Sequence, residues 1–180
     1  DWGIIPRAVF LLTQELNKLV SEHTETSYSI HCSYMQLYNE KISDLLSSNH
    51  NRYTFNNDHS LEIHEIVKGK NKGEIYVSGL AEYRVHDPND VIALLQQGNR
   101  NRAIRATELN EVSSRSHAIL QLLVEVQTQT ENRQKLIRRA KLVDLAGSEK
   151  INKNLEISKE QFKELTSINK SLARLGNVIS

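Results

Sequence analysis

The sequence contains only one cysteine, Cys32, and no long apolar run. A single cysteine excludes an intramolecular disulfide framework and is in keeping with a reducing compartment. No apolar stretch reaches the roughly 18 residues that suggest a membrane span, and the first residues do not have the charged leader and apolar stretch of a secretory signal. We therefore expect an intracellular protein that does not insert into a membrane.

The sequence also has little net charge, because 23 basic residues face 22 acidic ones, for a formal charge of +1. This balance excludes a general attraction to polyanions, so an acidic partner must be bound by a local patch. Residues 99–105 are rich in arginine but lack the interleaved aromatic residues typical of nucleic-acid binding. The seven histidines show no spacing that converges with cysteine or carboxylates. We expect neither a nucleic-acid partner nor a zinc site.

Three amphipathic helices are predicted. Pro6 precedes apolar residues spaced three to four apart, which indicates a helix ending near Ser21. Asp87 and Pro88 begin a second helix, and Gly98 is placed to cap its end. A last helix, over about residues 158–179, has apolar residues on one face and a narrow basic stripe on the other. The basic stripe consists of Lys159, Lys163, Lys170 and Arg174.

Alternation with a period of two predicts the strands. Residues 27–38 form one long strand, followed by a short connection over 39–46. Two short strands around a basic, glycine-containing turn are expected to form a hairpin that stands off the main sheet, and two longer strands are expected to form a second hairpin. These two pairs cover residues 61–64 with 74–77, and 118–126 with 136–145. The 180 residues form one domain, and because they begin with Asp1 we expect them to be part of a longer chain.

Two short segments contain side chains suited to phosphate chemistry. Asp144 ends a hydrophobic strand and Gly147 follows it. A carboxylate at a strand end can hold magnesium, and a nearby glycine lets its backbone N–H approach a terminal phosphate. Residues 110–117 read Asn-Glu-Val-Ser-Ser-Arg-Ser-His and offer three hydroxyls beside an arginine and a histidine. Taken singly, each segment is also compatible with an ordinary turn or a capped loop.

Taken together, the segments resemble the nucleotide switches of the kinesin family. Residues 110–117 are similar to its first switch, N-x-x-S-S-R-S-H, and residues 144–149 to its second, D-L-A-G-S-E; we call them the first and second switch segments. Further family motifs follow in the expected order at residues 3–7, 33–46, 168–172 and 175–179. The resemblance extends over nearly all of residues 1–180 and identifies them as a partial kinesin motor domain. It implies an incomplete α/β fold of the P-loop NTPase type, with three layers and a mostly parallel central sheet flanked by helices.

The resemblance implies ATP and Mg²⁺ as cofactors. Ser114 and Asp144 would hold the metal, partly through water, and Gly147 would sense the γ-phosphate. Arg115 and Glu149 would form the salt bridge that closes the switches, supported by Asn169. The implied nucleotide-binding residues are Asn110, Ser113, Ser116, Asp144 and Gly147, and the implied catalytic residues are Ser113, Ser114, Arg115, Ser116, Gly147 and Glu149.

The resemblance also implies that the parent protein is an ATP-driven motor in the cytoplasm that moves along microtubules, and a dimer would be in keeping with it. The last helix would be the switch II helix, and its basic stripe would bind the acidic surface of tubulin. A stripe of this kind is otherwise an ordinary solvated helix face.

The sequence departs from the family in two places. It contains no G-x-x-x-x-G-K-[ST] motif, the loop that anchors phosphates. Because the switches read a phosphate without anchoring it, we do not expect this stretch alone to hydrolyse ATP. Residues 150–156 also lack the glycines of the family's T-G-A-x-G. A kinesin-like protein that binds microtubules without nucleotide chemistry is therefore the alternative.

Overall fold

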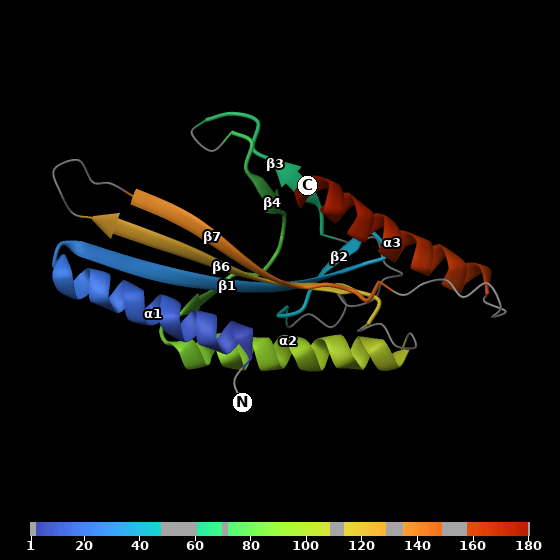
Figure 1. The fold of residues 1–180 in the computed structure, drawn as a ribbon. Coiled ribbons are helices and arrows are strands. Elements are labelled where there is room, and N and C mark those ends of the chain that lie inside the picture. The colour runs from blue at the N-terminus through green and yellow to red at the C-terminus, as the bar shows by residue number, and fades with distance from the viewer. Residues whose placement is uncertain are drawn as a thin grey trace.

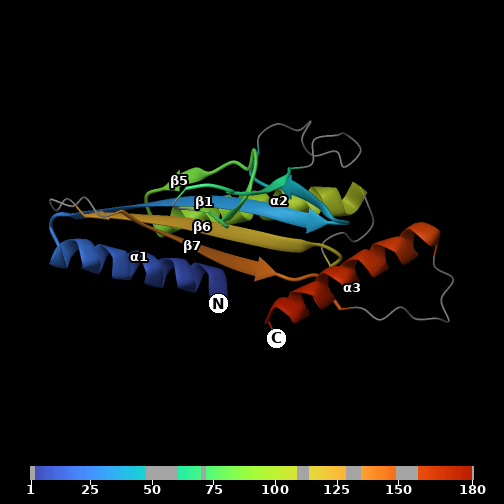
Figure 2. The same ribbon diagram turned by 90° about the horizontal axis from the view of Figure 1, so that it is seen from above.

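The computed structural model describes residues 3–47, 61–69, 72–108, 114–128, 135–148 and 158–179. A main sheet carries helices α1 (Ile4–Glu22) and α2 (Pro88–Glu108) on one face. Helix α3 (Lys159–Ile179) and a small hairpin lie on the opposite side, and α3 is at the end of the sheet (Figures 1 and 2). The helices and the layered α/β arrangement agree with the expectation. Among the described residues, no helix is long and apolar enough to cross a membrane.

The main sheet is built around β1 (Thr26–Tyr38), which pairs along its length with β6 (His117–Thr128). Beyond β6 lies β7 (Lys135–Asp144), while β2 (Lys41–Asp44) and β5 (Tyr83–Val85) share the other side of β1. Every pair of described strands is antiparallel. The prediction of a mostly parallel sheet is therefore wrong for these strands. Side chains alternate with a period of two in parallel and antiparallel strands alike, so the pattern does not indicate strand direction. A hairpin such as β1–β2, by contrast, can only pair its strands antiparallel.

The predicted connection over residues 39–46 contains strand β2, which forms a tight hairpin with β1. Asn39 and Glu40 have φ values of 47° and 62°, so both lie in the left-handed region that a two-residue turn of type I′ requires. Leu37 faces Ile42 across this turn. Glutamate is not among the residues favoured at such a position, which explains why the turn gave no clear signal in the sequence.

The hairpin predicted to stand off the main sheet is confirmed. Strands β3 (Ile63–Glu65) and β4 (Ile75–Val77) form a separate antiparallel sheet of two strands. Gly69 and Gly73 lie between them with φ near +90°. Only glycine adopts this conformation without strain, which accounts for the glycines of the basic turn.

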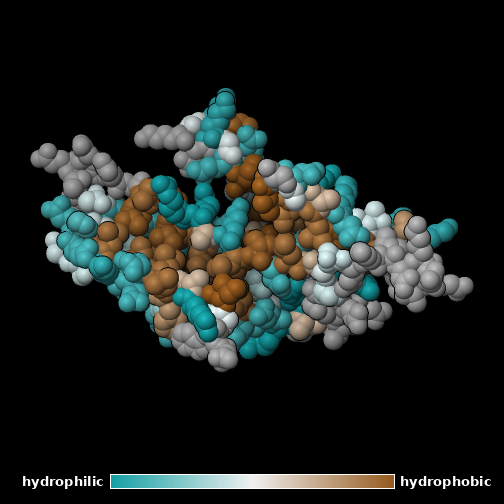
Figure 3. Space-filling view, in the orientation of Figure 1, coloured by the Kyte–Doolittle hydropathy of each residue, from teal (hydrophilic) through white to brown (hydrophobic). Residues whose placement is uncertain are grey.

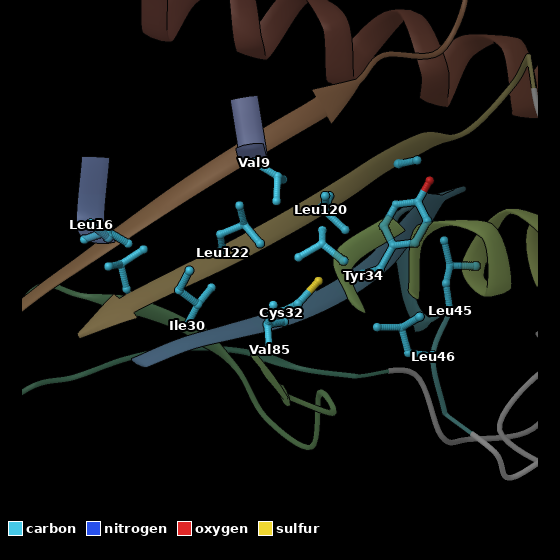
Figure 4. Packing of buried hydrophobic residues seen from close by; sticks show 13 residues of the cluster. Val9, Leu16, Ile30, Cys32, Tyr34, Leu45, Leu46, Val85, Leu120 and Leu122 are labelled. Atoms are coloured by element: carbon cyan, nitrogen blue, oxygen red, sulfur yellow. The ribbon is translucent and has the colours of Figure 1, made fainter. Parts of the chain in front are cut away.

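The apolar core lies between the sheet and helices α1 and α2 (Figure 4). Side chains of alternate residues on β1 and β6 meet Val9 and Leu16 of α1, and Leu45 and Leu46 close the end of the layer. Their removal from water provides the main stabilising contribution to this layer. The strand members of the core include Ile30, Cys32, Tyr34, Leu120, Leu122 and Val124. Burial raises the pKa of the Cys32 thiol to about 12, so this cysteine is an inert core residue.

The outer edge of β7 pairs with no other strand in the part of the chain that the structure describes. Leu136 and Val143 of β7 are 48% and 49% exposed. Apolar surface runs across the middle of the face that carries this edge (Figure 3). An open strand edge with apolar neighbours is prone to pairing with another chain.

Gly98 does not end α2, and the prediction of a cap there is wrong. The helix continues for ten further residues, to Glu108. A Cβ at Gly98 would lie 2.2 Å from Cδ1 of Tyr34, whose ring is buried against the helix. The glycine is therefore required by the close approach of an aromatic ring and not by helix termination.

We expect Gly98→Ala to lower the free energy of unfolding by about 1–2 kcal/mol, because the overpacking exceeds the gain in helix propensity. Gly176→Ala in α3 is the matched control, since a Cβ at Gly176 meets nothing within 4 Å. That change should raise the free energy of unfolding by up to about 1 kcal/mol. Urea denaturation of both variants checks the opposite signs, and equal effects would contradict the packing role of Gly98.

Candidate functional site

The two switch segments meet at one end of the main sheet. The first leads into β6 and the second follows β7, and the pairing of these strands sets Ala118 opposite Asp144. The backbone N–H of Gly147 donates a hydrogen bond to the carbonyl oxygen of Ser114 at 2.8 Å. Two segments separated by some thirty residues in the sequence are therefore in direct contact.

Arg102 of α2 connects both segments. Its Nη1 lies 2.7 Å from Oδ2 of Asp144, and its Nη2 donates to the carbonyl oxygen of Ser116 at 2.9 Å and to Oγ of Ser116 at 3.4 Å. Arg102 is 9% exposed, whereas the side chain of Asp144 is 67% exposed. The planar guanidinium contacts two partners at once, which an ammonium group cannot do with the same geometry.

His117 is buried between the second switch segment and α3. Its Nδ1 accepts a hydrogen bond from the backbone N–H of Ala146 at 3.0 Å, and its Nε2 lies 2.7 Å from Oγ of Ser171. Burial, and secondarily the positive charge of Arg102, lowers the pKa of His117, against a smaller opposing effect of Asp144. The ring is therefore held in its neutral form.

Arg115 of the first switch segment forms an ion pair with Glu164 of α3, with Nη1 3.3 Å from Oε2. The other oxygen of Glu164 accepts a hydrogen bond from the hydroxyl of Tyr38 at 2.8 Å. Burial, followed by this hydrogen bond, raises the pKa of Tyr38 to about 12. The Nε atom of Arg115 is buried and has no acceptor among the described residues. The guanidinium thus retains a donor for a further partner.

The remaining predicted site residues are distributed unevenly. Asn110, Ser113 and Glu149 lie outside the described residues. Ser114 is exposed beside the second switch segment, whereas Ser116 is fully buried and its hydroxyl is directed to Arg102. The assigned contacts of these residues with magnesium, phosphate and water stay predictions.

A cavity of about 520 Å³ opens beside Asp144. The N-terminus of α1 at residues 3–6, Leu95 of α2, and Leu142 and Val143 of β7 form its other walls. These walls are mostly apolar and supply one carboxylate, so the described residues do not include a phosphate-anchoring loop here.

The basic stripe of α3 is exposed along its length at Lys159, Lys163, Lys170 and Arg174. Nζ of Lys170 lies 2.8 Å from Oε1 of Glu40, in the turn of the β1–β2 hairpin. The hydrogen bond from Lys170, with its charge and a smaller contribution of Arg174, lowers the pKa of Glu40. One member of the stripe is therefore engaged within the chain, which leaves the stripe less uniformly available than its spacing suggested.

Sequence reasoning missed Arg102, Glu164 and Ser171. Arg102 belongs to an arginine-rich stretch that was weighed for nucleic-acid binding, and it was given no role at the switch segments. Glu164, Ile168 and Ser171 are spaced four and three residues apart and therefore share one side of α3. Ile168 is buried, and the polar residues on either side of it contact the switch region. The sequence signal for this contact was the presence of two polar residues, Glu164 and Ser171, one helical turn on either side of the apolar position Ile168.

Residues 1–180 match the family model described as the kinesin motor domain. The kinesin-like protein Klp61F of Drosophila melanogaster is 35% identical over 182 residues, covering 100% of this chain and 16% of the relative. The chromosome-associated kinesin KIF4 of Mus musculus is 35% identical over 178 residues, covering 99% of this chain and 13% of the relative.

Solved structures give the same relationship. The motor and motor homology domain of Kar3Vik1, fused to a synthetic coiled coil, matches with a TM-score of 0.79 at 29% identity, covering 98% of this chain and 41% of that one. A KIF14 dimer with AMP-PNP in complex with a microtubule matches with a TM-score of 0.75 at 36% identity, covering 99% and 48%. The chain thus spans less than half of the length of these proteins.

Proposed function

Because the chain belongs to the kinesin motor domain family, we propose that it is part of a motor that hydrolyses ATP and moves along microtubules. The observation that carries this proposal is the hydrogen bond from the Gly147 N–H to the Ser114 carbonyl oxygen. Two loops that respond to one γ-phosphate must lie side by side, and their ordering and release is a common way of converting hydrolysis into movement.

The residues present fit a magnesium nucleotide. Mg²⁺ prefers oxygen ligands and usually takes one or two carboxylates together with phosphate oxygens and water. Asp144 offers an exposed carboxylate, and Ser114 is exposed where the two switch segments meet, opposite Gly147. The described residues contain no group of three or more acidic, histidine or cysteine side chains that could hold a metal ion. When bound, Mg²⁺ would neutralise charge on the phosphates.

Residues of this chain then have separate roles in the proposed cycle. The N–H of Gly147 donates a hydrogen bond to Ser114 in this structure, and it would donate to the γ-phosphate when nucleotide is bound. The buried Nε of Arg115 has no acceptor among the described residues, which supports the proposed salt bridge with the carboxylate of Glu149. Arg102 would hold the two switch segments together, where they join β6 and β7, throughout the cycle.

The test is steady-state ATP hydrolysis by the full-length parent protein with increasing microtubule concentration. We expect turnover that depends on Mg²⁺ and rises with microtubules. Binding to microtubules without measurable hydrolysis would instead support the nucleotide-inactive alternative. Absence of both would overturn the proposal.

Replacing Lys159, Lys163 and Arg174 with alanine should weaken co-sedimentation of the full-length protein with microtubules, because positive charges near the acidic surface of tubulin are removed. The loss should be largest at low salt, where screening is weakest. Lys170→Ala should have a smaller effect than Lys163→Ala, since Lys170 is already paired with Glu40. Equal binding by the triple variant and the unmodified protein at low salt would contradict the role of the stripe.

A further inference from the structure

His117 of the first switch segment forms hydrogen bonds with both the second switch segment and α3. His117 is 7% exposed and lies at the start of β6. On one side it contacts the backbone two residues after Asp144, and on the other it contacts Ser171 in the middle of α3.

The hydrogen atoms of these contacts can be assigned without ambiguity. Because the N–H of Ala146 can only donate, Nδ1 of His117 must be the unprotonated nitrogen. The neutral ring therefore carries its proton on Nε2 and donates it to Oγ of Ser171. The hydroxyl of Ser171 in turn donates to the carbonyl oxygen of Ile168 at 2.7 Å. Each donor in this chain has one acceptor, so the position of the ring and that of α3 are fixed together.

Building on the proposed function, we propose that His117 is a positioning residue that couples the second switch segment to α3. Movement of the backbone at Ala146 and Gly147 displaces Nδ1, and the rigid ring passes that displacement through Nε2 to Ser171. The contact of Arg115 with Glu164 reaches the same side of α3 seven residues earlier, so the first switch segment contacts α3 at two points. The basic stripe on this helix would then move with the nucleotide state.

The bond to Ser171 is the part that can be removed without touching the nucleotide site. In the full-length protein, Ser171→Ala should reduce the maximal stimulation of ATP turnover by microtubules at least about fivefold, as expected for loss of a coupling free energy. Turnover without microtubules should change by less than about twofold. Ser171→Thr retains a hydroxyl and should restore stimulation.

Two further variants separate coupling from a general structural effect. The amide of asparagine reaches only the place of Nδ1, so His117→Asn keeps the acceptor for Ala146 and loses the donor to Ser171. His117→Asn combined with Ser171→Ala should be no worse than either single change, because both remove one contact. Thr166→Ala is the matched control, since its hydroxyl donates to Phe162 within α3 itself, and it should retain full stimulation.

The outcomes are distinct. Wild-type stimulation in Ser171→Ala, or multiplied losses in the double variant, would overturn the role of His117 while leaving the proposed motor function intact. If Thr166→Ala lost as much stimulation by microtubules as Ser171→Ala, the role of His117 would also be overturned. The loss would then follow from removing any hydroxyl in α3, and not from breaking the contact with His117. If the unmodified parent shows no stimulation by microtubules, the proposed function and this inference both fail. Thermal melting establishes that each variant is folded, and Ser171→Ala alone carries the test if His117→Asn does not fold.

Discussion

Gly147→Ala should reduce ATP turnover by the full-length protein at least about hundredfold, the loss typical of removing one preorganised donor to a developing anion. The backbone N–H of Gly147 lies at the contact between the switch segments, where it donates to Ser114. A methyl group here would keep the N–H from approaching a terminal phosphate closely. The measurement is steady-state turnover with and without microtubules, together with nucleotide affinity.

Ser148→Ala provides the control for this prediction, because Ser148 is the exposed next residue and has no assigned role. It should retain turnover within about twofold. Glu149→Ala should resemble Gly147→Ala if the salt bridge with Arg115 closes the switches. Unchanged turnover in Gly147→Ala would count directly against the assignment of residues 144–149 as a phosphate sensor.

The local elements were predictable because each depends on a short-range pattern. The helix that contains Pro6, the long strand near residues 27–38, and both predicted hairpins follow from the spacing of apolar residues and from turn-forming glycines. The membership of the chain in the kinesin motor domain family was predictable from contiguous motifs, and it is confirmed over residues 1–180. The P-loop NTPase fold class is likewise confirmed by the solved motor domains.

What sequence reasoning missed depends on contacts between distant residues. From its position in the sequence, Gly98 looked like a helix cap. The reason for a glycine in the middle of α2 is the ring of Tyr34, which lies 64 residues away in sequence. Strand direction was misjudged for the same reason, since β1 and β6 pair across separations of 80 to 102 residues, which no local pattern indicates. Arg102 looked like part of a basic patch until its partners in β7 and before β6 were known.

The site therefore consists of a predictable part and an unpredictable part. The switch segments are recognisable because their chemistry resides in contiguous residues. The groups that hold them against α2 and α3, namely Arg102, Glu164 and Ser171, are single residues in other helices. Such supporting groups determine how tightly the loops are coupled to the rest of the fold, so they are the places where coupling can be changed separately from nucleotide binding.

Arg102→Ala should lower the free energy of unfolding of the complete motor domain by about 2–3 kcal/mol, mainly because the buried carbonyl oxygen of Ser116 loses its donor. The ion pair with Asp144 contributes less, since that carboxylate is largely exposed and screened by water. Arg102→Lys should cause a smaller loss, because an ammonium group contacts only one of the two partners well. Urea denaturation of these variants checks the order.

Arg100→Ala is the matched control for Arg102→Ala, as Arg100 is an exposed arginine two residues earlier in the same helix. It should change stability by no more than about 0.5 kcal/mol. A loss in Arg100→Ala equal to that in Arg102→Ala would mean that arginine in α2 acts through general charge and not through its contacts. Because Gly147→Ala should leave the free energy of unfolding nearly unchanged, the two variants separate a residue that holds the switch segments together from one that reads the phosphate.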